Sequence, residues 1–172
     1  MKLNQSFVPV DNAKHLVKVF DCGKPDMNLF LSRFAVKHAK LGLSRTLVLP
    51  VDEPEAKKLK IAAYYTLAAS TITRKDIPAT NSLPRYPIPV AMLARLAVDI
   101  DFQGENLGAK SLIYALRHSV RLCDEGLPVL GLVLDVLDSD ALAFYQRFDF
   151  FSEISNDPMR LFVSMTALRK LC

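Results

Sequence analysis

Hydrophobic positions recur along this chain with two periods, one typical of helices and one typical of strands. The clearest helical stretch runs from about residue 106 to residue 125 and ends at Gly126 and Pro128. Its apolar stripe consists of Leu112, Ile113, Leu116, Val120 and Cys123. A less regular stripe predicts a helix from Asp26 to about Lys40, ended by Gly42.

Two shorter helices are predicted from polar residues that can cap a helix start. One begins at Asp11 or Asn12 and runs through Phe20, and the other begins at Asp138 or Ser139 and runs to about Arg147. Strands are predicted at Leu3–Val10, Thr46–Pro50, Leu59 to about Thr71, Val90–Ile100, Val129–Val136, Phe150 and Leu161–Met165. The order of elements indicates an α/β (α+β) fold in which helices flank a mixed central sheet with some parallel neighbours.

Four prolines interrupt the pattern between Ile77 and Val90, namely Pro78, Pro84, Pro87 and Pro89. Proline fixes the backbone angle φ and lacks an N–H donor, so this segment is predicted to be an exposed connector.

Length and composition suit one globular domain covering residues 1–172, because 51% of the residues are hydrophobic and 23% are charged. The chain has no apolar run of about 18 residues and no apolar segment after Met1, so we expect a cytoplasmic protein that does not enter a membrane. Cys22, Cys123 and Cys172 are widely spaced, which favours free thiols over a disulfide framework, and no metal site is expected.

The charge pattern is modestly basic, with 22 Lys and Arg against 18 Asp and Glu. Basic residues crowd the first quarter of the chain at Lys14, Lys18, Lys24, Arg33, Lys37, Lys40 and Arg45. Three more, Arg74, Lys75 and Arg85, fall in a later loop that includes the proline-rich segment and that we call the basic connector. This placement suits a polyanionic partner such as coenzyme A or RNA, and it equally suits a solvated basic surface.

The most informative stretch is a strand-like run, Leu96–Ala97–Val98, followed by a turn containing Gly104 and Gly108 that leads into the clearest helix. A helix start presents unpaired N–H groups and the positive end of the helix dipole, so such a turn can seat an anion. A plain strand-to-helix turn would have the same glycines.

The surrounding order resembles the GNAT N-acetyltransferases. Ala97–Val98 precedes Gln103–Gly104 and Gly108–Ala109, and Phe144–Tyr145 follows about forty residues later. The family's acyl-CoA loop reads Gln/Arg-Gly-x-Gly-x-Gly/Ala, and Phe-Tyr precedes a Gly-Phe pair. Two positions depart from the pattern, Asn106 at the middle glycine and Asp149 before Phe150, and both residue types tolerate left-handed backbone.

The resemblance implies the GNAT acyl-CoA fold, acetyl-CoA as cosubstrate and a set of contacts with it. The implied cofactor-binding residues are Leu96, Ala97, Val98, Gln103, Gly104, Glu105, Asn106, Leu107, Gly108, Ala109, Asp138 and Phe144. The resemblance also places Tyr145 beside the thioester sulfur. A phenol is protonated at neutral pH, so Tyr145 would deliver a proton to the departing thiolate. Without the resemblance, a Tyr among phenylalanines suggests core packing with a satisfied hydroxyl.

Other polar residues suggest roles less clearly. The strand before the turn contains no glutamate, so Asp99 and Asp101 are the candidate bases there, although aspartates beside a turn are usually structural. Arg95 shares a strand face with Leu93 and Ala97, which indicates either a pocket facing the substrate or a buried ion pair. The three histidines, His15, His38 and His118, are interpreted as solvated residues of predicted helices.

Further motifs resemble one branch of the family, the toxin acetyltransferases of bacterial toxin–antitoxin pairs. They are Phe20–Asp21–Cys22–Gly23, Asn28–Leu29–Phe30–Leu31, Ala63–Tyr64–Tyr65–Thr66–Leu67 and Arg95–Leu96–Ala97–Val98–Asp99. Such toxins acetylate the α-amino group of aminoacyl-tRNA and stop translation, and a ribbon-helix-helix antitoxin neutralises them. The resemblance also leads us to expect a homodimer. The sequence itself offers Arg95, Arg74, Lys75 and Arg85 as candidate substrate-binding residues.

Two alternatives stay open at this point. One is a GNAT enzyme that acetylates a small amine or a protein amino group. The other is an inactive acyl-CoA-binding module, which the departures at Asn106 and Asp149 allow.

Overall fold

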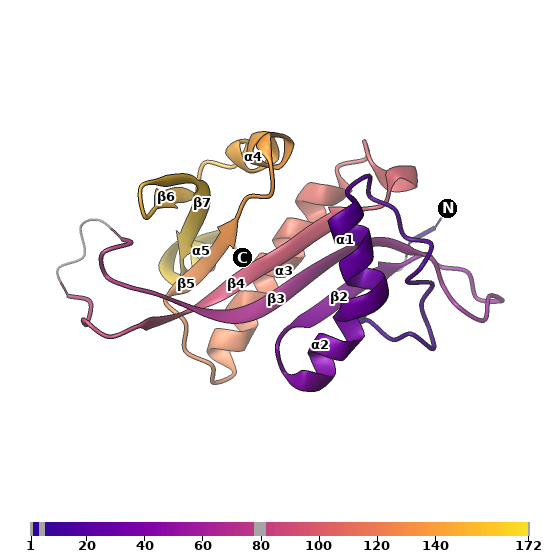
Figure 1. Ribbon diagram of the computed structural model, residues 1–172, viewed down its shortest axis with the longest axis horizontal. Helices are drawn as coiled ribbons and strands as arrows, with labels where there is room; N and C mark the ends of the chain where they lie inside the picture. Colours follow the sequence, from indigo (N-terminus) through magenta and orange to yellow (C-terminus); the bar gives the residue numbers. More distant parts are fainter. Residues whose placement is uncertain (1, 4–5, 78–81, 172) are drawn as a thin grey trace. The chain divides into compact units, whose positions relative to one another are not determined.

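The computed structural model describes residues 2–3, 6–77 and 82–171 (Figure 1). Pro78 and Cys172, which entered the predictions above, lie outside the described residues. Seven strands form a mixed sheet in the order β1-β2-β3-β4-β5-β7-β6. The chain divides into two compact units. Unit 1 comprises residues 1–68 and 95–115, and unit 2 comprises residues 69–94 and 116–172. Among the described residues, no helix is both long and apolar enough to span a membrane.

The strands of unit 1 are antiparallel. β1 (Val8–Pro9) pairs with β2 (Arg45–Pro50), which pairs with the first part of β3 (Ile61–Ile72). The predicted strands at Thr46–Pro50 and from Leu59 are confirmed. The predicted strand Leu3–Val10 is confirmed only at Val8–Pro9, an edge position that suits a proline because its missing N–H is not needed by a further strand.

The predicted helix from Asp26 is present as one continuous helical run with a change of pitch in its middle. It consists of α1 (Pro25–Leu29), a π-helical turn η1 (Phe30–Phe34) and α2 (Ala35–Leu41). It starts one residue earlier than predicted, at a proline, whose fixed φ suits the first helical position. It ends at Gly42, which has φ 76°. The inserted π turn accounts for the irregular apolar stripe.

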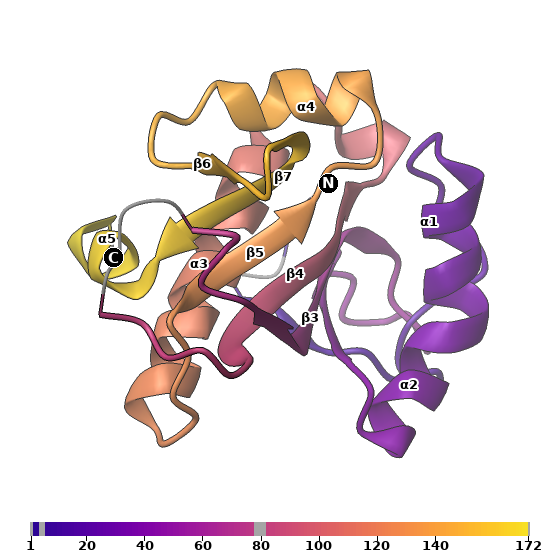
Figure 2. The ribbon, with the colours of Figure 1, turned by 60° about the vertical axis from the view of Figure 1, so that its left-hand side comes forward.

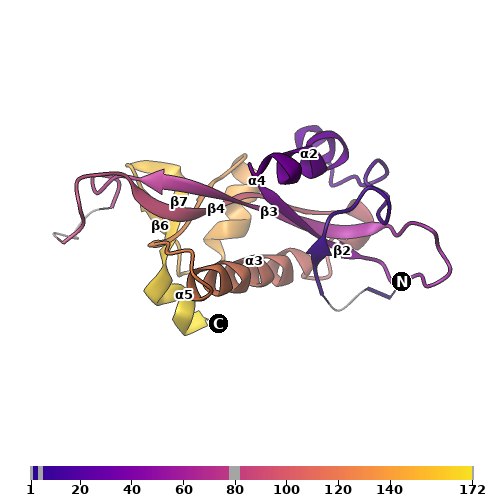
Figure 3. The same cartoon turned by 90° about the horizontal axis from the view of Figure 1, so that it is seen from below.

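The sheet in unit 1 has an apolar cluster on each face. Figure 3 shows α2 on one side of the sheet and α3 on the other. The cluster on the side of α1 and α2 includes Phe30, Leu31, Tyr64 and Ala97. The other cluster includes Phe102 and Leu107, from the start of α3. The end of β4 therefore packs between two helical layers of unit 1.

The predicted helix from Asp11 or Asn12 through Phe20 is wrong. This segment forms turns, and it bridges to Leu59 at His15. The Asp11 side chain accepts a hydrogen bond from Ala13 N, and Leu16 N donates to Leu59 O at 2.8 Å. A polar side chain that can cap a helix can equally close a turn, and here pairing with another segment takes up the backbone groups.

The predicted strand Val90–Ile100 is β4 (Ile88–Val98), which begins earlier and ends earlier than predicted. Ile100 instead belongs to a short 3-10 helix, η2 (Ile100–Phe102), which leads to α3 (Leu107–Asp124). The long helix is therefore confirmed. Leu112 and Leu116 are buried as predicted, but Ile113, Val120 and Cys123 are half-buried, while Ser111, Ala115 and Ser119 are buried instead.

Unit 2 is built around β5 (Gly131–Asp135), which pairs in parallel with β4 and antiparallel with β7 (Asp157–Ser164). β6 (Ser152–Ile154) pairs with β7, and α4 (Ser139–Gln146) follows β5 (Figure 2). The parallel pair and the capped helix were predicted. The expected strand at Phe150 is wrong, because this residue lies in a turn, and Met165 begins a helix, α5 (Met165–Leu171), rather than ending a strand.

Candidate active site

The turn between η2 and α3 has the backbone expected of an anion seat. Gly104 has φ 87° and Asn106 has φ 63°, so Asn106 adopts the left-handed conformation that its replacement of a glycine required. The first helical hydrogen bond of α3 runs from Lys110 N to Asn106 O. In the described part of the chain, no acceptor is found for the N–H groups of Leu107, Gly108 and Ala109. They are thus available to a ligand.

The turn is braced by polar contacts within unit 1. Asp99 is buried, and its two carboxylate oxygens accept hydrogen bonds from Asp21 N at 3.0 Å and Asp101 N at 2.9 Å. The Gln103 amide donates to Val98 O at 2.8 Å and to Cys22 O at 3.2 Å. The hydrogen bonds of Asp99 favour the structural interpretation of this residue, and those of Gln103 connect the turn to β4 and to Cys22.

The remaining turn and strand residues predicted to bind the cofactor lie in unit 1 with this seat. Leu96 and Val98 are half-buried at the end of β4, Ala97 is buried in the core, and Glu105 is exposed. Because Ala97 packs into the core on the α1 side, its side chain is not available to a ligand. We retain its backbone as a predicted contact.

Arg95 has neither a carboxylate partner nor full exposure. Its guanidinium carbon lies 4.3 Å from the centre of the Phe30 ring, and its Nη1 lies 3.8 Å from the Met27 sulfur. No acidic partner is found among the described residues. The interpretation as a buried ion pair is therefore wrong.

Tyr145 lies in unit 2, on α4, and is 8% exposed. Its ring makes edge contacts with Phe144 and Phe151, and burial raises the pKa of its phenol. Within the described residues, no hydrogen-bond partner is found for its hydroxyl. The alternative interpretation of a core tyrosine with a satisfied hydroxyl is thus not supported.

Three other residues singled out by the sequence analysis, Asp138, Phe144 and Asp149, lie close to Tyr145 in the sequence. Asp138 caps α4 by accepting a hydrogen bond from Ala141 N at 2.9 Å, which confirms the capping prediction. Phe144 is half-buried and contacts Phe148. Asp149 does not adopt left-handed backbone, since only Asn106, Ser155 and Asn156 do so among the described residues other than glycine. The turn after α4 therefore needs no glycine at this position.

The basic connector residues Arg74, Lys75 and Arg85 are all exposed in unit 2. Asp76 holds the first part of the connector: its carboxylate accepts hydrogen bonds from the Ser155 hydroxyl at 2.6 Å and from Thr73 N at 2.7 Å. These bonds keep the pKa of Asp76 below its usual value, the bond from Ser155 having the largest effect.

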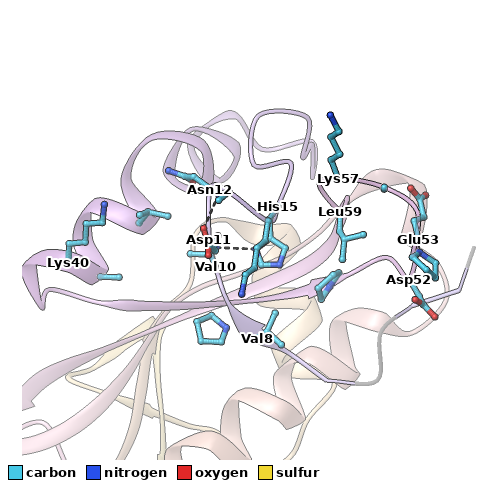
Figure 4. Close-up of a pocket in the computed structure, with 18 residues that line it drawn as sticks. Val8, Val10, Asp11, Asn12, His15, Lys40, Asp52, Glu53, Lys57 and Leu59 are labelled. Carbon is cyan, nitrogen blue, oxygen red and sulfur yellow. Dashed lines mark hydrogen bonds between the residues drawn. The ribbon is translucent and has the colours of Figure 1, made fainter.

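One histidine does not fit its predicted solvated role. His15 is 3% exposed, and its Nδ1 accepts a hydrogen bond from Asp11 N at 3.0 Å. Burial lowers the pKa of its imidazole. His15 lines a groove of about 1180 Å³ in unit 1, together with Asp11, Lys40, Lys57 and other residues (Figure 4). None of the residues of the turn between η2 and α3 line this groove.

The sequence analysis did not predict that Tyr64, Met27 and Phe30 lie together around Arg95. Tyr64 is fully buried on β3, and its hydroxyl donates to Met27 O at 2.7 Å. Burial raises the pKa of Tyr64, while the charge of Arg95 opposes the shift. The Ala63–Leu67 motif drew attention to the strand but gave no indication of this partner on α1.

No protein-family model matches the chain. The chain is 32% identical over 158 residues to a tRNA-acetylating toxin of Mycobacterium tuberculosis, covering 90% of this chain and 89% of the relative. A crystal structure of a KacT mutant has a TM-score of 0.88 at 22% identity, covers 100% of both chains and shows the fold alone.

The chain is also similar to three solved complexes of the toxin AtaT. AtaTR bound with acetyl-CoA has 26% identity and a TM-score of 0.82, over 99% of this chain and 98% of that one. AtaT with acetyl-methionyl-tRNAfMet has 26% identity and a TM-score of 0.84, over 96% and 98%. An AtaT mutant bound to the C-terminus of the antitoxin AtaR has 25% identity and a TM-score of 0.81, over 99% and 98%.

These likenesses confirm the mixed fold and the resemblance on which the functional expectation rests. Because the mycobacterial relative is matched along nearly its whole length, the chain belongs to the family of tRNA-acetylating toxins.

Proposed function

We propose that this chain transfers an acetyl group from acetyl-CoA to the α-amino group of an aminoacyl-tRNA and thereby inhibits translation. The observation that carries the proposal is the match to the tRNA-acetylating toxin over nine-tenths of the chain. The AtaT complexes support it further, because solved structures contain that relative with acetyl-CoA and with acetyl-methionyl-tRNAfMet.

The start of α3 supports the acetyl-CoA part of the proposal. The open N–H groups of Leu107, Gly108 and Ala109 would bind the pyrophosphate, with the helix dipole favouring its negative charge. The backbone of Leu96–Val98 at the end of β4 would bind the arm that leads to the thioester. Asp138 and Phe144, from the family resemblance, complete the proposed set.

Tyr145 is the proposed catalytic residue. The neutral amine attacks the thioester carbonyl, the carbon–sulfur bond breaks, and the thiolate takes the proton of the Tyr145 hydroxyl. The amine loses its own proton to solvent, and the Tyr145 oxygen regains one from solvent before the next turnover. The raised pKa keeps the phenol protonated at neutral pH. Apolar surroundings also raise the proton affinity of a thiolate held beside the ring, so burial does not by itself oppose the transfer.

The substrate amine needs no strong base. An α-amino group has a reference pKa of about 7.7 to 8.0, so an appreciable fraction is neutral at pH 7. With Asp99 engaged in structural hydrogen bonds, we propose that solvent accepts the proton. The exposed Arg74, Lys75 and Arg85 would attract the tRNA backbone.

The proposal has consequences for assembly and location. Residues 1–172 are proposed to form a single catalytic domain, as the family resemblance implies. An antitoxin is the proposed partner, as found for AtaT, and its ribbon-helix-helix type and the homodimer are carried over from the family. A substrate of translation implies a cytoplasmic protein without a membrane partner.

The proposal is tested by incubating the protein with radiolabelled acetyl-CoA and either a charged or a deacylated tRNA pool. Label should enter only the charged pool, and the acetylated aminoacyl species identifies the substrate. Labelling of small amines or of proteins in place of tRNA would favour a different acceptor. Undetectable acetyl-CoA binding would favour an inactive module.

A further inference from the structure

Arg95 occupies an unusual setting for an arginine on an otherwise apolar strand. It is half-buried near the end of β4, and the Phe30 ring covers one face of its guanidinium at 4.3 Å. Its Nη1 points to the Met27 sulfur at 3.8 Å, and thioether sulfur is a weak acceptor. In the described residues, no carboxylate neutralises its charge.

This setting leaves most of the binding capacity of the guanidinium unused. Arginine has five N–H donors in a planar fork that matches a phosphate or a carboxylate. Tyr64, a nearby buried side chain whose pKa is lowered by the charge of Arg95 against the larger effect of burial, already donates its hydroxyl to Met27 O. Partial removal of an unpaired charge from water is costly, which indicates that an anionic ligand completes this site.

The wall that carries Phe30 and Met27 is built rigidly. Asn28 accepts a hydrogen bond from Cys22 N and donates to the Asp21 carboxylate, both at 2.9 Å. Asp21 N in turn donates to Asp99, in the segment leading to the cofactor turn. Phe30 begins the π-helical turn η1, and such turns occur frequently at functional sites. The ring under Arg95 is therefore held by the same network that supports the turn.

The proposed function restricts what the anion can be. The α-carboxyl group of the amino acid in an aminoacyl-tRNA is esterified and carries no charge. The anions that every aminoacyl-tRNA has at its acceptor end, whatever its amino acid, are therefore phosphates, and those nearest the amino acid are phosphodiesters. The pyrophosphate of acetyl-CoA is already assigned to the start of α3. Resting on the proposed function, we infer that Arg95, backed by Phe30, binds the phosphodiester next to the terminal adenosine of the aminoacyl-tRNA.

The experiment compares two minimal acceptors that carry the amino acid identified in the tRNA pool. One is the 3′-aminoacyl adenosine, which lacks a phosphate, and the other is the 3′-aminoacyl cytidylyl-adenosine, which has one phosphodiester. A charge-assisted bond of about 1.5–3 kcal/mol predicts that wild-type KM is lower for the dinucleotide by roughly 10-fold to 100-fold. In Arg95→Met this ratio should fall to about 1, and Arg95→Lys, which keeps the charge but loses the fork, should lie between.

Phe30→Leu provides a second variant that leaves the charge intact. It removes the aromatic platform and should reduce the dinucleotide advantage about twofold to fivefold, with the corresponding energy near 0.5–1 kcal/mol. Circular dichroism should show folded protein for each variant assayed. A wild-type ratio near 1, or a ratio that Arg95→Met leaves at its wild-type value, would overturn the inference.

The proposed function and the Arg95 inference are contradicted by different results. A wild-type protein that acetylates neither charged tRNA nor either minimal acceptor overturns the proposed function and this inference with it. Acetylation of charged tRNA together with an unchanged KM ratio in Arg95→Met overturns the Arg95 inference alone.

Discussion

Replacing Tyr145 with phenylalanine removes one hydroxyl and almost no volume, so it tests acid catalysis separately from packing. General acids contribute about 10²- to 10⁴-fold in rate, which corresponds to roughly 2.7–5.5 kcal/mol in the barrier. The hydroxyl has no hydrogen-bond partner in the described part of the chain, so its loss leaves no buried group unpaired. The unfolding free energy should therefore change by less than about 1 kcal/mol.

Tyr64→Phe is the matched control. Tyr64 is also a buried tyrosine with a raised pKa, but its hydroxyl donates to Met27 O at 2.7 Å. Removing that donor deletes one hydrogen bond to Met27 O, which still accepts from Phe30 N, and should cost about 0.5–1.5 kcal/mol of stability. The two single-hydroxyl deletions should thus separate: Tyr64→Phe lowers stability, and Tyr145→Phe lowers the rate.

The assay combines single-turnover acetylation of charged tRNA, urea unfolding and calorimetric titration with acetyl-CoA. Tyr145→Phe should be slowed by about 10² or more, with acetyl-CoA affinity and unfolding midpoint near wild type, and should no longer inhibit growth. A Tyr145→Phe protein as stable as wild type and equally fast would refute the catalytic assignment. A large loss of stability would refute the conclusion that the hydroxyl has no structural partner.

Three further predictions concern the cofactor turn, the basic connector and Asp76, whose hydrogen bonds hold the start of the connector. Gly108→Val places a β-branched side chain in the first turn of α3 and should weaken acetyl-CoA binding about tenfold or more by calorimetry; unchanged affinity would remove the turn from the cofactor site. Neutralising Arg74, Lys75 and Arg85 together should raise the KM for tRNA and flatten its salt dependence, and an equal loss toward a short aminoacyl mimic would contradict tRNA attraction. Because the Asp76 pKa is lower in the folded state, its stabilising effect should be complete above about pH 5 and be lost as pH falls through the usual Asp pKa of about 3.9 and below. Urea unfolding at each pH measures this loss of stability, and the loss should be smaller in Asp76→Asn.

The sequence predicted those elements whose local signals agree with their packing. The helix start at Asp138, the helix end at Gly42 and the strand-to-helix turn at Gly104 combine a residue type with the backbone geometry that it favours. Asn106 was also interpreted correctly as a left-handed residue, because few other residue types tolerate that conformation.

The failures occur where a distant partner decides the outcome. The segment from Asp11 forms turns because Lys14 and Leu16 exchange hydrogen bonds with Leu59, which local capping signals do not reveal. Arg95 contacts the ring of Phe30, a residue far from it in the sequence, so its neighbour could not be predicted from the pattern of its own strand. Met165 begins a helix although its apolar neighbours continue the pattern of a strand.

The most direct test of acetyl transfer to aminoacyl-tRNA is mass spectrometry of the 3′-terminal nucleoside. Charged tRNA is incubated with acetyl-CoA and the wild-type protein, digested with nuclease and compared with a reaction containing Tyr145→Phe. The account predicts aminoacyl-adenosine carrying one acetyl group on the α-amine in the wild-type reaction and little of it in the variant. Acetyl groups on the nucleobase or ribose, or unmodified aminoacyl-adenosine after prolonged wild-type incubation with every charged species, would contradict it.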